Sequence, residues 1–166
     1  GQASDGYLCV KCHMVEKPYM VIDWRADHSF RVPRPDLTAT LGTRDACSTC
    51  HDDKPLQWSI DAFTKWYGTA RKPHYANVFA AARAGRTTVA PELARLADSE
   101  LQSSMVRATA LEHLSYLPAP EAQRSLEAAL MSGDPLLRQT AASRLYEPDP
   151  ARRLELLGPL LDDPRK

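Results

Sequence analysis

The chain has 166 residues and no formal net charge, because 21 lysines and arginines balance 21 aspartates and glutamates. A balanced charge gives no electrostatic attraction to nucleic acid or to an anionic membrane surface, so neither partner is expected. No stretch approaches the roughly 20 consecutive apolar residues of a membrane span. The length suits one ordinary domain or two small ones.

One cysteine and histidine pattern occurs twice near the N-terminus. The residues are Cys9, Cys12 and His13 in the first copy and Cys47, Cys50 and His51 in the second. They use all four cysteines of the chain. Cys-x-x-Cys pairs occur in dithiol redox couples, in zinc sites and where haem is attached covalently, and only haem attachment needs the adjacent histidine.

Three other uses of the cysteines fit less well. A thioredoxin-like pair should follow a buried strand, but the segments before Cys9 and Cys47 are short, polar and turn-like. A zinc ribbon would use both pairs, but their separation exceeds the usual spacing of about 15 to 20 residues and leaves the histidines unexplained. A disulfide within each pair would close a strained short loop.

The spacing therefore predicts two covalently bound haem c groups. Two thiols one helical turn apart reach two positions on one porphyrin edge, and the next imidazole then lies under the iron. His13 and His51 become iron ligands. Because thioether attachment takes place outside the cytoplasm, we expect a periplasmic or extracellular protein. Gly1 is expected to follow a removed export signal or to lie within a longer chain.

The composition changes near residue 75. Upstream lie both motifs, four of the five histidines, all three tryptophans and proline-rich connectors, whereas alanine, leucine, arginine and glutamate dominate downstream. We expect a mainly α protein with a small, loop-rich di-haem module at 1–75 and a helical domain at 76–166. Trp58 and Trp66 are expected to be buried core residues on a helix that follows the second motif.

Apolar residues recur at helical spacing throughout the second part. Helices are predicted at 76–84, 90–98, 104–117, 119–132, 134–146 and 149–161. Gly85, Gly133 and several prolines separate them. Asp98, Asp134 and Asp149 are candidate N-caps.

Two of these helices contain an internal sequence repeat. "MVRATALEHL" (105–114) aligns with "LLRQTAASRL" (136–145), and "GDPLLR" (133–138) anticipates "DDPRK" (162–166). A period of about 30 residues predicts an α-solenoid of stacked helix pairs, similar to HEAT repeats, with a four-helix bundle as the alternative. The terminal "DDPRK" reads as the start of another repeat, so we expect the repeat domain to be truncated.

Each iron needs a second axial ligand. His28 lies in a non-helical stretch between the motifs, where nearby prolines restrict the backbone. His74 follows a proline at the start of the first long helix. Both are predicted ligands. The preferred pairing sets His74 opposite His13 and His28 opposite His51, and the reverse pairing is the alternative. His113 lies in mid-helix and is read as an ordinary repeat residue. Met20 belongs to an apolar run that is expected to pack against the porphyrin.

Nearly the whole chain resembles a known family, and the resemblance is specific over residues 8–85. "CVKCHM", "YMVIDWRADHSFRVPRPDL", "ACSTCHDDKPLQWSIDAFTKWYG" and "PHYANVFAAARAG" are similar to the haem-binding part of multihaem c-type cytochromes that carry HEAT or tetratricopeptide repeats. The resemblance implies covalent haem at both motifs and a distal ligand role for His28. The chain departs from many members by lacking further haem motifs upstream. In the family, such a histidine can also serve another haem or a neighbouring subunit.

The leading functional expectation is electron transfer without catalysis. Its partners would be redox proteins, further cytochrome subunits or other copies of the chain in an oligomer or filament. The alternative is a subunit of a haem oxidoreductase in which one iron has an open coordination position. A third possibility is that the haems only stabilise the structure of a small domain. No nucleophile elbow or phosphate-binding glycine loop competes, so no catalytic residue is predicted.

Overall fold

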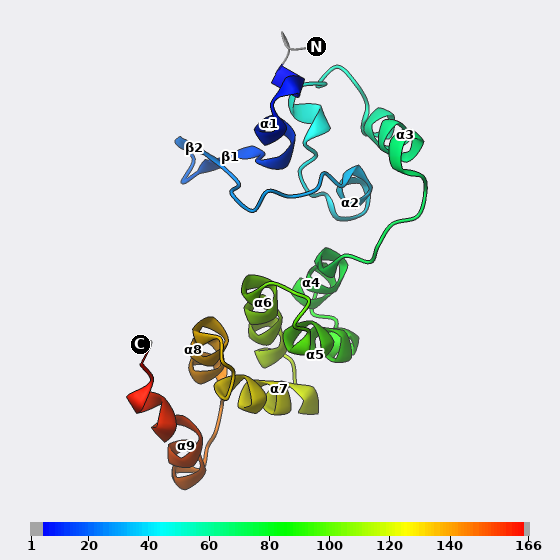
Figure 1. The fold of residues 1–166 in the computed structure, drawn as a ribbon. Coiled ribbons are helices and arrows are strands. Elements are labelled where there is room, and N and C mark those ends of the chain that lie inside the picture. The colour runs from blue at the N-terminus through cyan, green and yellow to red at the C-terminus, as the bar shows by residue number, and fades with distance from the viewer. Residues whose placement is uncertain (1–4, 165–166) are drawn as a thin grey trace. The chain divides into compact units, whose positions relative to one another are not determined.

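The computed structural model describes residues 5–164 and is mainly helical, which confirms the expected class (Figure 1). The chain divides into two compact units, residues 1–72 and 73–166. The division at Lys72 and Pro73 lies close to the composition change seen in the sequence. No helix in the described range is long and apolar enough to cross a bilayer.

The first unit consists of short elements joined by loops. They are a 3-10 turn at Asp5–Tyr7, α1 Cys9–His13, β1 Glu16–Tyr19, β2 Asp23–Ala26, α2 Pro35–Leu41, a 3-10 turn at Cys47–Thr49 and α3 Leu56–Tyr67. The strands form an antiparallel hairpin, which the sequence did not lead us to expect, with Glu16 opposite Ala26. Helices α2 and α3 pack against each other.

The tip of this hairpin is apolar and strained. Met20 and Val21 have positive φ angles of 49° and 73°. Left-handed backbone is unfavourable for a β-branched residue such as Val21. Ile22 completes the tip, and Val21 and Ile22 are each 88% exposed. Exposed apolar side chains on a strained turn are typical of a surface that meets another group.

The second unit contains six longer helices. They are α4 Tyr75–Arg83, α5 Ala90–Asp98, α6 Ser104–Ser115, α7 Pro120–Leu130, α8 Pro135–Arg144 and α9 Pro150–Leu157, with 3-10 turns at Thr87–Val89 and Gly158–Asp162. Each of the six helices predicted here is confirmed, with ends that differ by a few residues. Prolines open α7, α8 and α9, since a first-turn residue needs no N–H for the helix.

Two of the three predicted caps are confirmed. Asp134 accepts the backbone N–H of Leu136 at the start of α8, and Asp149 accepts that of Ala151 at the start of α9. The prediction for Asp98 was wrong, because it is the last residue of α5. Ser103 caps α6 instead.

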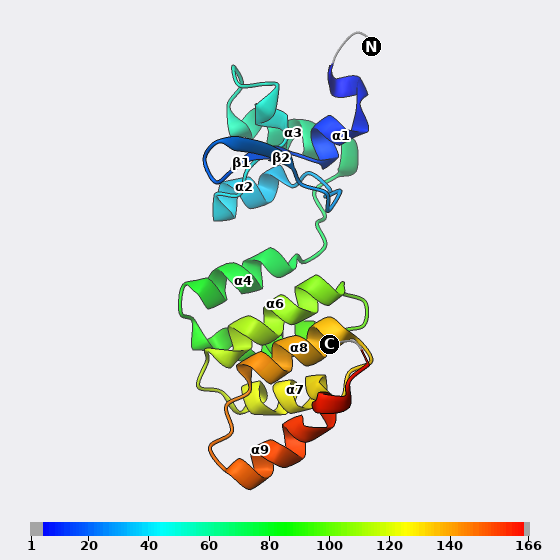
Figure 2. The same cartoon turned by 90° about the vertical axis from the view of Figure 1, so that its left-hand side faces the viewer.

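Alternate helices of the second unit lie in two layers. Helix α6 contacts α4 and α8 (Figure 2), while α7 contacts α5 and α9, and the α5–α6 and α7–α8 pairs join the layers (Figure 1). Leu93, Leu111, Leu114 and Leu137 are fully buried at the centre. Each such leucine stabilises the unit by about 1.5–3 kcal/mol relative to an exposed one.

The aligned helices α6 and α8 repeat the same local contacts. Thr109 and Thr140 each donate a hydrogen bond to the carbonyl four residues earlier, over 2.7 and 2.8 Å. The Asp-Pro steps also bond back to the helix before the preceding one, on α6 and α8. Asp134 accepts the Ser104 hydroxyl, and Asp163 accepts Arg138 Nη2 over 2.9 Å.

Candidate haem-binding site

The first motif occupies a one-turn helix. Cys9, Cys12 and His13 all lie on α1, and both thiols are exposed. Nδ1 of His13 lies 2.7 Å from the carbonyl oxygen of Arg31. A carbonyl only accepts, so Nδ1 carries the proton and Nε2 keeps its lone pair. The ring is therefore in the tautomer that binds a metal through Nε2.

A second contact fixes the plane of this imidazole. The rings of His13 and Phe30 are stacked, with centroids 4.7 Å apart and planes 7° apart. Phe30 itself has a positive φ of 47°, an unfavourable angle for a bulky side chain. The loop after β2 thus holds the histidine of the first motif at two points, through Arg31 and Phe30.

The second motif begins in a 3-10 turn that Asp45 caps. Asp45 is buried, and its carboxylate accepts the backbone N–H groups of Cys47 and Ser48 over 3.2 and 3.3 Å. The His51 ring lies 4.6 Å from that of Trp58 on α3, between centroids. This contact could have been predicted from the sequence, because an aspartate often accepts the backbone N–H two residues later. The sequence analysis made no such prediction for Asp45.

Both motifs belong to the first compact unit, although they are well separated in sequence. Burial raises the pKa of the Cys47 thiol, with a further rise from the Asp45 carboxylate. The fold therefore brings both predicted attachment sites into one small unit.

His28 lies in the loop between β2 and α2 and is exposed. Its Nδ1 lies 2.9 Å from the carbonyl oxygen of Ala26, so Nε2 again keeps its lone pair. Asp27 secures the same loop, because it accepts the backbone N–H of Ser29 and Nε of Arg31. The hydrogen bonds from Ser29 and the charge of Arg31 lower the pKa of Asp27.

His74 is arranged differently. It belongs to the second unit and caps α4, where its Nδ1 accepts the backbone N–H of Ala76 over 3.1 Å. Because an N–H only donates, a neutral His74 carries its proton on Nε2. Iron binding through Nε2 would break this cap, at a cost of about 0.5–2 kcal/mol.

The surroundings of the motifs are apolar but exposed. In the described part of the first unit, the buried residues are Pro35, Leu37, Asp45, Ala46 and Ser59. Large apolar side chains lie on its surface instead: Tyr7, Leu8, Val10, Tyr19, Met20, Val21, Ile22, Trp24, Phe30, Val32, Trp58, Trp66 and Tyr67. The predicted burial of Trp58 and Trp66 on α3 was wrong, since Trp66 is 69% exposed. A large apolar cofactor would cover such a surface, so the residues present fit haem.

The cysteines are not paired with one another. All four are free thiols. Among residues 5–164, no three His, Cys, Asp or Glu side chains gather closely enough to hold a metal ion.

The sequence reasoning did not predict the contacts that Phe30, Arg31 and Asp45 make with the two motifs. Phe30 and Arg31 act on His13 only through the folded loop, so no local pattern identified them. No protein-family model, no curated protein and no solved structure matches this chain. Any function proposed for the site therefore depends on its own residues and geometry.

Proposed function

We propose that the protein transfers electrons outside the cytoplasm through two covalently bound haem c groups. The observation that carries the proposal is the pairing of two Cys-x-x-Cys-His motifs with a unit that lacks an apolar core of its own. The large buried cluster of the described chain lies entirely within the second unit. The first unit needs a large apolar group to complete it, and its cysteines supply the attachment points.

The chain's residues have distinct parts in this proposal. Cys9 and Cys12 would anchor one haem, and Cys47 and Cys50 the other. His13 would bind iron through Nε2 while Arg31 holds its Nδ1 proton, an arrangement that orients the ring and strengthens it as a donor. Bound haem supplies a one-electron iron couple.

His51 and His28 have related parts. His51 would bind the second iron in the way that His13 binds the first, and His28 offers Nε2 for the opposite face of a haem. Since both motifs belong to the first unit, both haems would be held in one small unit. That arrangement favours electron exchange between them.

The second unit would serve as a docking or assembly surface. Its two layers of alternate helices and the repeated contacts of α6 and α8 favour a HEAT-like solenoid. Solenoids present extended surfaces to partners, here redox proteins, further cytochrome subunits or other copies of the chain. Because haem c is attached outside the cytoplasm, we place the protein in the periplasm or outside the cell.

One observation favours a second function. His28 is the one predicted distal ligand in the first unit, and the N-cap bond of His74 opposes the tautomer that an iron ligand needs. If His74 keeps its cap, one iron has an open face. The protein would then be a subunit of a haem oxidoreductase.

Intact mass and optical spectra of the exported protein test the cofactor. We expect the mass of the polypeptide plus two haems, and loss of one haem in the double variant Cys47→Ala, Cys50→Ala. The variant Ser48→Ala changes a residue between these cysteines and should keep both haems. A colourless protein, or one that contains zinc, would contradict the proposal.

His74→Asn then separates the two functions, because asparagine keeps a cap acceptor but does not bind haem iron in place of histidine. For an electron carrier, both haems are low-spin in the parent protein and one becomes high-spin in the variant. For an oxidoreductase subunit, one haem is high-spin in the parent and binds cyanide, and the variant has the same spectrum. Electron paramagnetic resonance distinguishes these outcomes.

A further inference from the structure

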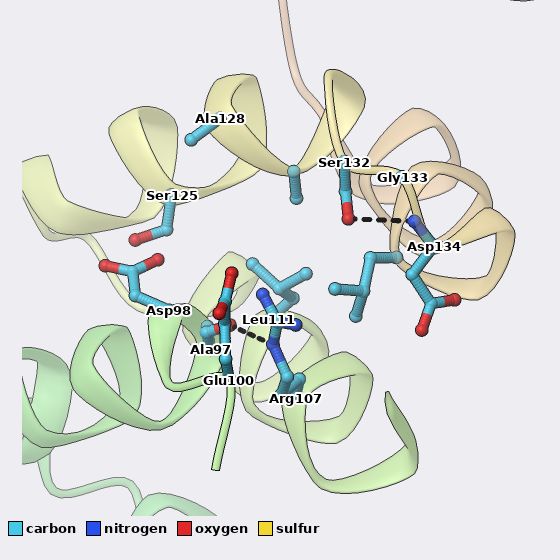
Figure 3. A pocket seen from close by; sticks show the side chains of 12 residues that line it. Ala97, Asp98, Glu100, Arg107, Leu111, Ser125, Ala128, Ser132, Gly133 and Asp134 are labelled. Carbon is cyan, nitrogen blue, oxygen red and sulfur yellow. Dashed lines mark hydrogen bonds between the residues drawn. The ribbon is translucent and has the colours of Figure 1, made fainter. Parts of the chain in front are cut away.

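A pocket of about 550 Å³ lies in the second unit, apart from both cysteine motifs. Helices α5, α6, α7 and α8 and the loops that follow α5 and α7 contribute its lining (Figure 3). Its volume is within the range of small-molecule sites, about 300–1,000 Å³. None of the residues assigned to haem lines it.

Ser125 of α7 marks the pocket as incomplete. The residue is 3% exposed, and its hydroxyl has no hydrogen-bond partner. Figure 3 shows the side chain pointing from α7 toward the side of the pocket where Asp98 lies. Buried hydroxyls are normally bonded, because an unpaired one loses its hydration without replacement. A ligand in the pocket would provide the missing partner.

Two unpaired carboxylates stand at the rim. Asp98 ends α5 and Glu100 follows in the loop, and both are exposed. Across the described chain, neither side chain takes part in an ion pair or a hydrogen bond. The C-terminal end of α5 adds partial negative charge at the same place. This side of the pocket therefore attracts a cation.

Arg107 supplies a positive group in the same pocket. Its Nε donates to the carbonyl oxygen of Ala97 over 2.8 Å, which fixes the guanidinium plane. Nη1 and Nη2 make no hydrogen bond or ion pair among residues 5–164 and remain available to an acceptor, although the charge of Arg107 contributes to the lowered pKa of Asp134. Asp134 also lines the pocket but is engaged by Ser104 and by the N-cap bond of α8.

We propose that this pocket binds a free basic α-amino acid such as L-lysine. Asp98 and Glu100 bind its ammonium groups, the Nη atoms of Arg107 bind its carboxylate, and Ser125 gains a hydrogen-bond partner. The two unpaired carboxylates, Asp98 and Glu100, and the guanidinium of Arg107 match the two ammonium groups and one carboxylate of the ligand, while Asp134 stays engaged by Ser104 and Leu136. A simple anion or a simple cation would leave one set of protein groups unpaired.

Calorimetric titration of the intact protein with three matched probes tests the ligand class. L-Lysine is the full probe, L-norleucine lacks the side-chain ammonium, and 1,5-diaminopentane lacks the carboxylate. We expect lysine to bind and each of the other two to bind at least about tenfold more weakly, because each loses a charge-assisted contact. Equal binding of all three, or no binding of lysine at millimolar concentration, would overturn the proposal.

Variants locate the site. Asp98→Asn and Glu100→Gln should each weaken lysine binding about tenfold, while Glu121→Gln, outside the pocket, should leave it unchanged. Ser125→Ala should weaken lysine binding but leave the melting temperature of the ligand-free protein equal or higher, since it removes an unpaired buried hydroxyl. Lysine binding that resists all three pocket substitutions would place the ligand elsewhere and refute the proposal. None of these results depends on haem.

Discussion

His13 and His74 use the same ring nitrogen in opposite ways. Nδ1 of His13 faces a carbonyl and must donate, whereas Nδ1 of His74 faces a backbone N–H and must accept. The partner of one nitrogen decides where the other carries its proton. At the scale of single residues, His13 and His28 are therefore ready to bind a metal through Nε2, and His74 is ready to cap a helix.

His28→Ala tests the distal ligand. We expect one haem to change from low to high spin, because the variant removes an axial nitrogen and leaves both attachment motifs intact. His113→Gln is the matched control, since His113 lies in the second unit and should leave the spectrum unchanged. An unaltered low-spin spectrum in His28→Ala would remove His28 from the ligand set. Optical and paramagnetic resonance spectra provide the measurement.

His113 should make the stability of the second unit depend on pH. Burial lowers the pKa of this imidazole, helped by Arg83, and its ring lies 5.4 Å from that of Phe79 between centroids. A lowered pKa means that the folded state disfavours the protonated ring. The stabilisation is complete above the unfolded pKa of about 6.5 and is lost as the pH falls through the folded value.

The measurement compares wild type with His113→Gln across this range. We expect the free energy of unfolding of the wild type to fall, relative to the variant, between about pH 7 and pH 5. Parallel curves for the two proteins would show that another group controls the pH dependence.

At the scale of elements, short signals at helix ends set the limits of the second unit. Asp-Pro steps open α8 and α9, where aspartate caps the helix and proline occupies its first position. Asp134 also accepts the Ser104 hydroxyl, so one carboxylate connects the starts of α6 and α8. This hydrogen bond is the main cause of the lowered pKa of Asp134.

Asp134→Ala should destabilise the second unit by about 1 kcal/mol at neutral pH, the usual cost of a lost N-cap. Asp134→Asn is the matched control, because asparagine caps nearly as well but has no charge. The lowered pKa of Asp134 predicts that the advantage of wild type over the asparagine variant holds above about pH 4 and disappears as the pH falls further. Urea unfolding at pH 7 and pH 3 measures both effects, and equal stability of all three proteins at pH 7 would contradict them.

At the scale of the whole molecule, the two units reach stability by different means. The second unit buries a continuous cluster of leucine and alanine side chains from α5 to α8, together with Phe79 of α4. The first unit buries few residues and exposes many large apolar ones. A unit that buries so little apolar surface does not offset the entropy of ordering its chain.

Removal of haem attachment should therefore unfold one unit and spare the other. In a variant with all four cysteines changed to serine, we expect residues 5–72 to lose protection from amide hydrogen exchange. Residues 75–144 should keep theirs, because their packing needs no cofactor. The cysteine-to-serine changes at the second motif alone form the intermediate control. Full protection of the first unit without haem would contradict our explanation of its exposed surface.

Much of the second unit could be predicted because its information is local. Apolar spacing, Asp-Pro steps and glycines act within one or two turns, so α4 to α9 were found with nearly correct ends. The misassigned cap shows the limit of such reasoning, because Asp98 and Ser103 are both suitable residues. What distinguishes the two residues is where α5 ends. Asp98 still belongs to α5, whereas Ser103 directly precedes α6.

The sequence by itself determined the two Cys-x-x-Cys-His motifs, the mainly helical class and the internal repeat of the second unit. Only the tertiary structure decided which side chains meet. It stacked Phe30 on His13, made the Nδ1 atoms of two histidines donors and of a third an acceptor, and left Ser125 without a partner. These contacts join residues that no fixed spacing relates, or depend on a hydrogen-bond direction that residue identity does not specify. Residue types determine which chemistry is available, but packing determines the direction in which each side chain points.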